Sequence, residues 1–213
     1  MVTFHFLPGK SAEAMRILQE EALPLYRLDR PLLRFRAYRE VESPEPLDLV
    51  VVSSFEGLAG MDESNRALAD EAQKNGTSVR ALYERIGDLT QSHRDELAEL
   101  DPSLAWGEVD EAKLQVWISI RPVPGGLDGY RTLLRDELVP WERKSETITG
   151  SETGIYLLSS GYRILRVVGI DDLDAWHRYQ SESRKTTSFR KADQLTAEER
   201  EIVLAPQREL AVR

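Results

Sequence analysis

The sequence contains no cysteine and only three histidines, and these two scarcities exclude several common catalytic and metal-binding chemistries. Without cysteine there is no disulfide, no thiolate nucleophile and no cysteine-ligated zinc or iron–sulfur site. The histidines, His5, His93 and His177, are far apart in the sequence. Any imidazole base or ligand must be one of these three. The sequence therefore indicates no metal ligand and no cofactor-binding residue, and its catalytic residues stay unknown.

Other signals are also missing. The formal net charge of −9 and the pI of about 5.0 argue against a protein that neutralises phosphates, so we expect no nucleic-acid partner. No apolar run reaches the roughly 18 residues of a membrane span, and residues 1–6 do not resemble a signal peptide. A cytoplasmic protein without membrane contact is the simplest interpretation. Gly9-Lys10-Ser11 imitates a phosphate-binding loop, but Phe4 stands where that motif needs its first glycine.

An internal repeat is the most informative feature that is present. Pro8-Gly9, followed by a helical stretch ending at Pro24, returns as Pro124-Gly125 with a helix ending at Pro140, 116 positions later (8 to 124, 24 to 140). Residues 55–61 then match 170–176, and residues 83–90 match 189–196, in the same order. Such a duplication predicts two domains of similar architecture, over residues 1–105 and 113–213.

Each repeat is predicted to run strand, helix, strand, strand, helix, strand. The first strand spans residues 2–7, or 114–121 in the second copy, and its helix covers about 12–27. Hairpins follow at 32–55, around a turn at 43–46, and at 155–170, around Ser160-Gly161. Second helices start near Leu58 and Leu173, and 96–100 and 202–205 are the expected fourth strands. Residues 101–113 are the expected linker.

This order is the split β-α-β arrangement of the ferredoxin-like fold, which is an α+β class with helices on one face of an antiparallel sheet. The other face needs a cover, so we expect the two sheets to pack face to face. One chain would then form a pseudo-dimer, and further association into a homodimer stays open.

The chain resembles the dimeric α+β-barrel superfamily, and within it the NIPSNAP-like branch. The resemblance rests on Pro8-Gly9-Lys10 after the first strand, on Leu23-Pro24 at the helix end, and on Phe55 and Leu58 before the second helix. It implies a tandem barrel over nearly the whole chain. Relatives in this superfamily include cofactor-free monooxygenases, haem-handling enzymes, lactone isomerases and proteins without known activity, so the fold alone does not select a function.

Strand alternation yields a candidate binding site for a small aromatic or carboxylate ligand. In the first strand of each repeat one face is apolar and the other mixed, with His5 and Arg121 at equivalent positions of the mixed faces. The predicted lining of an internal cavity comprises His5, Arg34, Arg36, Tyr38, Trp117 and Arg121. Arginine and tyrosine side chains are suitable donors to a carboxylate or phenolate. The alternative is that these side chains form a hydrogen-bonded network without a ligand, or that they are exposed to solvent.

Three functions remain open at this stage. The first is a small-molecule binder or cofactor-free enzyme, similar to a monooxygenase or an isomerase. The second is a non-catalytic interaction or scaffold protein, and the third is a haem-handling protein that would use His5 or His177 as the iron ligand. Whether the chain is an enzyme is not decided by its residues.

Overall fold

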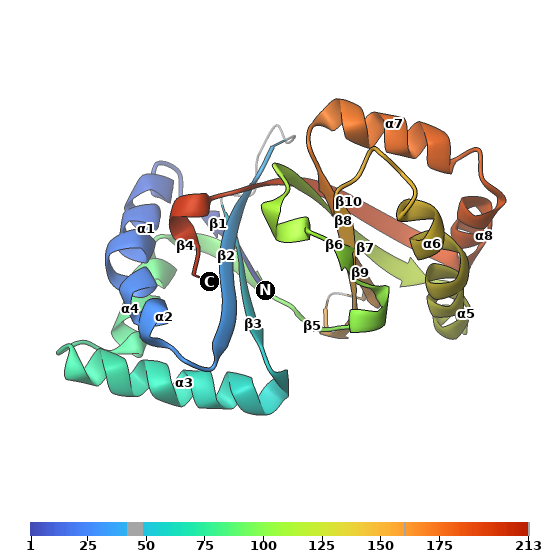
Figure 1. Cartoon of the computed structure of the whole chain (residues 1–213). Helices are drawn as coiled ribbons and strands as arrows, with labels where there is room; N and C mark the ends of the chain where they lie inside the picture. Colours follow the sequence, from blue (N-terminus) through green and yellow to red (C-terminus); the bar gives the residue numbers. More distant parts are fainter. Residues whose placement is uncertain (42–48, 160, 213) are drawn as a thin grey trace. The chain divides into compact units, whose positions relative to one another are not determined.

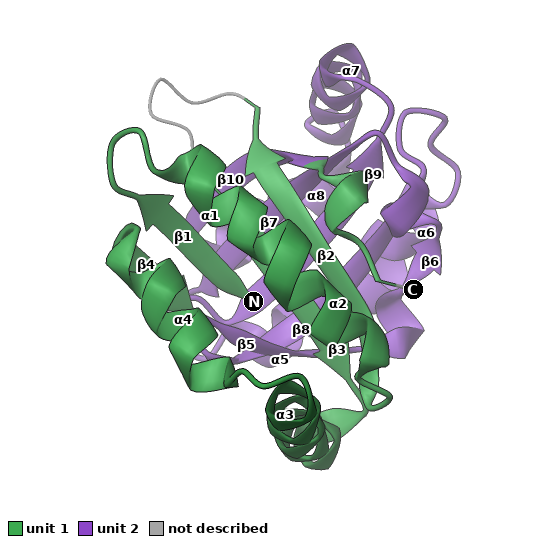
Figure 2. Ribbon diagram, turned by 90° about the vertical axis from the view of Figure 1, so that its left-hand side faces the viewer, with its two compact units in different colours: residues 1–95, 206–213 green, residues 96–205 purple. Residues whose placement is uncertain are grey.

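A computed structural model describes residues 1–41, 49–159 and 161–212. The predicted turn at 43–46 and the turn residue Ser160 lie outside these residues. The chain forms two compact units (Figure 2): unit 1 comprises Met1–Asp95 and Pro206–Arg213, and unit 2 comprises Glu96–Ala205. These bounds differ from the expected 1–105 and 113–213, since residues 96–112 pack with the second repeat and the C-terminal residues pack with the first.

Unit 1 has the element order that the repeat predicts. Its elements are β1 (Val2–Phe6), α1 (Ser11–Ile17), the π-helical η1 (Leu18–Ala22), α2 (Leu23–Leu28), β2 (Leu32–Glu40), β3 (Leu49–Phe55), α3 (Gly57–Lys74), α4 (Val79–Asp88), β4 (Thr90–Asp95) and, near the C-terminus, η5 (Arg208–Leu210). The strands pair antiparallel in the order β4-β1-β3-β2. Helices α1, α2 and α4 cover one face of this sheet (Figure 1).

Unit 2 repeats this plan. Its elements are β5 (Leu97–Leu100), η2 (Pro102–Leu104), β6 (Trp106–Gly107), η3 (Val109–Glu111), β7 (Leu114–Pro122), α5 (Leu127–Leu133), the π-helical η4 (Leu134–Leu138), α6 (Val139–Glu142), β8 (Gly150–Leu158), β9 (Ile164–Ile170), α7 (Leu173–Ser183), α8 (Thr187–Leu195) and β10 (Thr196–Pro206). The antiparallel order β10-β7-β9-β8 equals that of unit 1, with β5 added at the edge.

Two expectations about the end of the first repeat are wrong. The fourth strand of unit 1 is Thr90–Asp95, and Leu97–Leu100 pairs instead with β8 of unit 2. Strand β4 was missed because it is an exposed edge strand without the apolar alternation of a half-buried strand. The expected linker at 101–113 is an ordered part of unit 2. Its β6 lies so close to β8 that a Cβ at Gly107 would stand 2.2 Å from the carbonyl oxygen of Thr149.

The periodicity predicts one regular α-helix as the first helix of each unit. The structure instead has a π-helical turn in front of the proline of this helix. The backbone N–H of Leu23 bonds the carbonyl of Leu18, and that of Val139 bonds the carbonyl of Leu134, both five residues back. Proline has no N–H and its ring collides with the carbonyl four residues earlier. The wider turn accommodates Pro24 and Pro140, so the repeated proline explains the repeated irregularity.

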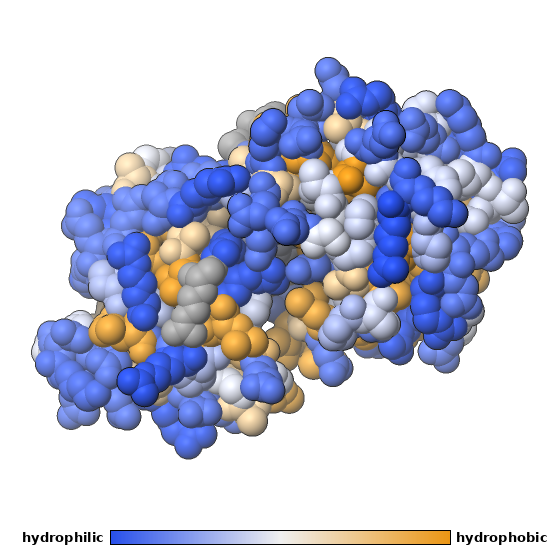
Figure 3. Space-filling view, in the orientation of Figure 1, coloured by the Kyte–Doolittle hydropathy of each residue, from blue (hydrophilic) through white to orange (hydrophobic). Residues whose placement is uncertain are grey.

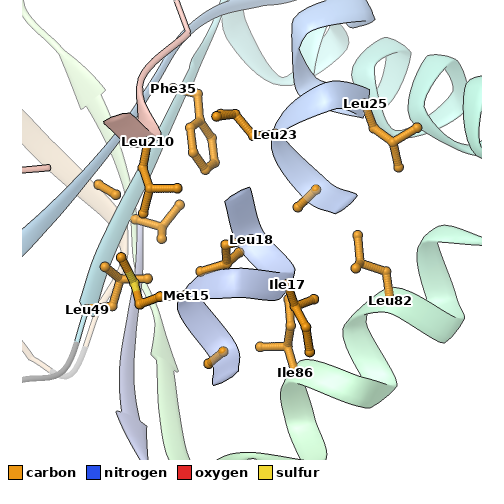
Figure 4. Packing of buried hydrophobic residues seen from close by; sticks show 14 of the residues in the cluster. Met15, Ile17, Leu18, Leu23, Leu25, Phe35, Leu49, Leu82, Ile86 and Leu210 are labelled. Carbon is orange, nitrogen blue, oxygen red and sulfur yellow. The ribbon is translucent and has the colours of Figure 1, made fainter. Parts of the chain in front are cut away.

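Each unit has its own hydrophobic core between its sheet and its helices. In unit 1, Figure 4 shows Ile17 of the first helix packed toward Ile86 of α4, and Met15 on the sheet side beside Leu49. Strand residues Phe35 and Leu49 close the core, together with Leu210 from the C-terminal segment. That segment is fastened to β2, because the backbone N–H of Val212 donates to the carbonyl of Phe35 at 3.0 Å.

A repeated ion pair connects the π-helical turn to the last helix of each unit. In unit 1, Arg85 donates to both carboxylate oxygens of Glu21, at 2.5 and 2.8 Å. In unit 2, Lys191 donates to Glu137 at 2.7 and 3.0 Å, and Ser188 adds a bond of 2.7 Å. These carboxylates therefore have the same structural role in both repeats.

Hydrophilic residues cover most of the surface seen in Figure 3. Within the described ranges, no helix combines the length and the apolar character that crossing a bilayer requires.

The Glu137 contact predicts a pH-dependent stability. Hydrogen bonds from Lys191 and then from Ser188, together with the Lys191 charge, lower the pKa of Glu137 from its ordinary value of 4.5. The bond therefore contributes stability above about pH 4.5 and loses it as the pH falls through the lowered pKa. We expect Glu137→Gln to be less stable than the parent at pH 7, and the two to converge at acidic pH, in urea unfolding followed by tryptophan fluorescence. Glu146→Gln, at an exposed residue of the same unit, is the control; an equal pH trend there would contradict the prediction.

Candidate functional site

The sheet face of unit 1 opposite its helices holds four of the six predicted site residues. Arg34, Arg36 and Tyr38 alternate on β2 with Phe35 and Ala37, which belong to the core. His5 alternates on β1 with Phe4 and Phe6, which pack against the same core. The predicted alternation is therefore present.

These four side chains do not converge on one point. By register, Tyr38 and Thr3 both pair with Val50, near the start of β3. Arg34 pairs with Ser54, near the end of β3. His5 lies two residues past Thr3, on the side away from Ser54. His5 and Arg34 are thus separated by on the order of 20 Å along the strands. Arg34 donates to the Ser54 hydroxyl at 3.3 Å.

Arg36 has a structural function in unit 1. Its Nη1 donates to the carbonyl oxygens of Phe35 at 3.0 Å and of Val212 at 2.9 Å. The guanidinium thereby holds the C-terminal segment against β2. Arg36, predicted to line a ligand cavity, therefore donates to backbone carbonyls.

In unit 2 the corresponding face carries an ordered polar row on β7. Trp117 Nε1 donates to Gln115 Oε1 at 2.9 Å, and Gln115 Nε2 donates to the Val109 carbonyl at 2.9 Å. The residues before β7 thus fix the orientation of the indole through Gln115. One step further along β7, the Ser119 and Tyr156 hydroxyls lie 3.0 Å apart. Since Ser119 pairs with Leu165 of β9, the Tyr156 phenol extends from β8 across β9 to reach Ser119.

Arg121 lies at the end of this face and forms an exposed ion pair with Glu198. Glu198 also accepts a hydrogen bond of 2.8 Å from the Tyr162 hydroxyl. The predicted ligand contact Arg121 is therefore engaged by a neighbouring carboxylate. An exposed pair of this kind contributes little to stability.

Arg200 of β10 is the functional candidate that the sequence did not indicate. It stands directly opposite Ser119 in the β10–β7 register, and its guanidinium carbon lies 5.6 Å from the centre of the Tyr162 ring. Its Nε is buried and has no hydrogen-bond acceptor among the described residues. Arg200 was missed because the expected strand began at residue 202, whereas β10 begins at Thr196. A strand extended backwards would have placed Arg200 on the Ser119 face.

Unit 1 repeats the arginine and hydroxyl pair in a simpler form. Arg94 of β4 stands opposite Thr3, at the positions equivalent to Arg200 and Ser119. Arg94 is exposed on an edge strand, and Glu40 occupies the position equivalent to Tyr156. The phenol on this face of unit 1 is that of Tyr38, which stands in line with Thr3 through Val50. Unit 2 has the Tyr156 phenol instead, together with an indole anchored by Gln115.

The helix-facing side of the unit 2 sheet contains a buried polar network. Glu142 of α6 accepts hydrogen bonds from Arg166, from the Tyr179 hydroxyl at 2.6 Å, and from Ser151 at 3.2 Å. Glu142 is fully buried and Arg166 is 3% exposed. Burial favours the neutral arginine, but the Glu142 charge outweighs it and raises the pKa of Arg166. Burial, and then Glu142, raise the pKa of Tyr179 well above 10.0.

In unit 1 the helix-facing side of the sheet has apolar residues at the positions equivalent to Thr153 and Arg166. By the repeat spacing of 116 and 115 positions (37 to 153, 51 to 166), Ala37 and Val51 are equivalent to the register partners Thr153 and Arg166. Both belong to the apolar core of unit 1. The polar network is thus a feature of unit 2 and not a requirement of the fold.

A titratable carboxyl lies at the edge of the same layer. Partial burial, and then the nearby Glu201 charge, raise the pKa of Glu199 to about 7. The residue as a whole is exposed, and Gln180 of α7 donates to Glu201 at 3.1 Å. These carboxyls share the face of Ile118 and Ile120 by register, so they do not belong to the Trp117 side.

The histidines do not form a convincing iron or metal site. His93 and His177 are exposed, and His5 is half-buried on the unit 1 sheet. No group of three or more metal-ligating side chains is found within the described parts of the chain.

Comparisons with solved structures identify the fold. An anthrone oxidase-like protein matches with a TM-score of 0.68 and 13% identity, over 96% of this chain and 88% of its own. A protein assigned as a monooxygenase, from Lactobacillus acidophilus, matches with a TM-score of 0.64 and 9% identity, over 96% and 91%. Chlorite dismutase from Candidatus Nitrospira defluvii in complex with imidazole matches with a TM-score of 0.58 and 12% identity, over 98% and 91%.

No protein-family model matches the chain, and no curated protein matches it. The structural matches show that the chain has the dimeric α+β-barrel fold, built from tandem ferredoxin-like units. The expected fold class is confirmed. Membership of the superfamily, its NIPSNAP-like branch and the face-to-face packing of the sheets stay predictions.

The buried pair of unit 2 generates a prediction about stability. We expect Arg166→Met to lower the free energy of unfolding by about 3–5 kcal/mol, because it leaves the Glu142 carboxylate buried without its cation. The double variant Glu142→Leu/Arg166→Met should recover most of this loss, since it removes both charges. Urea unfolding followed by tryptophan fluorescence reports on this unit alone, because Trp106, Trp117, Trp141 and Trp176 all belong to it.

Ile164→Met on the same face of β9 is the matched control and should cost less than about 1.5 kcal/mol. Equal stability of the Arg166→Met single variant and the parent would contradict the prediction. It would mean that the Glu142 charge is compensated by other groups.

Proposed function

We propose that unit 2 binds a small aromatic molecule with an anionic oxygen on the sheet face of Trp117, and oxidises it without a cofactor. The observation that carries this proposal is the buried, unpartnered Nε of Arg200 beside the Ser119–Tyr156 hydroxyl pair. The same face offers an indole whose orientation Gln115 fixes.

The donors fit an oxyanion. A guanidinium N–H without an acceptor costs free energy when buried, and a phenolate, enolate or carboxylate oxygen would remove that cost. Ser119 and Tyr156 can rotate one hydroxyl hydrogen toward the same oxygen while keeping the bond between them. Trp117 would supply an apolar surface for the ring system.

The likeness to an anthrone oxidase-like protein and to an assigned monooxygenase supports the choice of reaction. Anthrone carries an acidic CH₂ group in its central ring, across that ring from a conjugated carbonyl. Loss of one proton gives an enolate, whose oxygen Arg200 would stabilise. Dioxygen then places one oxygen atom on the former CH₂ carbon and leaves the other as water. The substrate loses both hydrogens and supplies all four electrons, so the step needs no further reductant.

Arg121 has a smaller part in this proposal than the sequence indicated, because Glu198 already forms an ion pair with it.

The following experiment distinguishes this proposal from the alternative of a non-catalytic interaction protein. That alternative requires neither ligand binding at Arg200 nor oxygen consumption.

We expect purified protein to accelerate the oxidation of anthrone in air, measured as oxygen uptake together with anthraquinone absorbance. Arg200→Gln should lower kcat/KM by about 10- to 100-fold, as for a lost charged hydrogen bond of about 1.5–3 kcal/mol. Tyr156→Phe should have a smaller effect in the same direction. Arg94→Gln, at the equivalent position of unit 1, is the matched control and should leave the rate unchanged.

Binding is measured separately, by anaerobic titration with anthrone and tryptophan fluorescence, with Trp117→Phe to identify the responding indole. Binding without oxidation would retain the site and refute the reaction. Equal loss in Arg200→Gln and Arg94→Gln would refute the site in unit 2. Neither binding nor oxidation would leave the interaction protein as the better function.

A further inference from the structure

The segment that joins the two repeats forms one wall of a pocket in unit 2. Residues 97–113 precede β7 and include η2, which packs against η4 of the first helix. A pocket of about 270 Å³ lies between them, on the helix side of the sheet and away from the Trp117 face. The joining segment contributes Asp101, Ser103 and Leu104 to this charged groove.

The opposite wall is one face of the helix. Asp128, Arg131, Thr132 and Arg135 stand at spacings of three, four and seven residues, so they line up along the helix axis. The acidic Asp128 is at one end and the two arginines follow. With 1.5 Å per residue, the midpoint of the arginines is roughly 7–8 Å from Asp128. The charged row on this wall therefore runs from a negative to a positive side chain, while Asp101 on the opposite wall lies 3.4 Å from Arg131.

The arginines are only weakly engaged. Asp101 accepts hydrogen bonds from the Ser103 hydroxyl at 2.6 Å and from its backbone N–H at 3.1 Å, whereas Arg131 approaches Asp101 only to 3.4 Å. Arg135 bonds its exposed sequence neighbour Asp136. Exposed contacts of this kind are worth little, so a ligand can replace them at small cost.

The equivalent face of unit 1 lacks this pattern. The repeat spacing of 116 positions places Ala12, Met15, Arg16 and Gln19 where unit 2 has its charged row (12 to 128, 15 to 131, 16 to 132, 19 to 135). Met15 is buried in the core there. The charged row thus occurs in unit 2 and not at the equivalent positions of unit 1.

We propose that the charged groove binds a small zwitterion of the ω-amino acid class. Its carboxylate lies between Arg131 and Arg135, and its ammonium group lies at Asp128. Leu104, which is 2% exposed, supports the connecting methylene chain. A ligand with one charge satisfies only one end of the groove and leaves the other charges without a new partner.

The test is a titration of the full chain followed by NMR, with 6-aminohexanoate as the probe. Hexanoate and hexylamine carry one charge each, and 3-aminopropanoate carries both at a shorter separation. We expect saturable shifts of the backbone amides of 101–104 and 128–135 with 6-aminohexanoate at millimolar concentration, and at least threefold weaker binding of the other three compounds. Arg131→Gln and Arg135→Gln should each weaken binding about three- to tenfold.

Arg16→Gln is the matched control, because Arg16 is an exposed arginine of the equivalent helix in unit 1 with its own ion pair to Glu20. It should leave binding unchanged. The proposal is overturned if 6-aminohexanoate does not bind below about 20 mM, a range where net affinity would be only about −2 kcal/mol. Equal binding of hexanoate or hexylamine, or unchanged affinity in both arginine variants, would also overturn it.

Discussion

The alternation of side chains across each strand is the constraint on which both units depend. An antiparallel sheet with helices on one face must turn an apolar set toward them, and the intervening residues are then free to differ. On β2, Phe35 and Ala37 belong to the core. Arg34 and Arg36, which alternate with them, make polar contacts on the other face. Core packing and surface chemistry therefore occupy alternate positions of the same strand, and each can change without disturbing the other.

Unit 2 departs from this division by placing charges in its core, and unit 1 shows that the fold does not need them. Desolvation of Glu142 and Arg166 is costly, and their attraction together with the Tyr179 and Ser151 hydrogen bonds offsets it. Ala37 and Val51 fill the equivalent positions of unit 1 with apolar groups. A polar layer of this kind specifies one arrangement of α6 and α7 on the sheet, because each donor has a fixed acceptor.

The sequence predicted what repeats and alternates. The duplication, the element order, the apolar stripes and the faces of His5, Arg34 and Trp117 follow from local patterns. The polar edge strand Thr90–Asp95 has no such pattern, and neither has the first half of β10. Arg200 lies in that half of β10 and was therefore not predicted to be on a strand. The Arg166–Glu142 pair was not predictable either, because it joins residues 24 positions apart on a strand and a helix, and no periodicity relates them.

Comparison of the copies also shows where unit 2 differs from unit 1. Thr3 and Arg94 form the same hydroxyl and cation pairing as Ser119 and Arg200, whereas the second pairing lies beside the Tyr156 hydroxyl and an indole held by Gln115. Gln115 bonds both this indole and the carbonyl of Val109, in the segment that joins the two repeats. A change in that segment can therefore alter the orientation of Trp117 without touching the core. The two copies thus keep the same strand order while their polar groups differ.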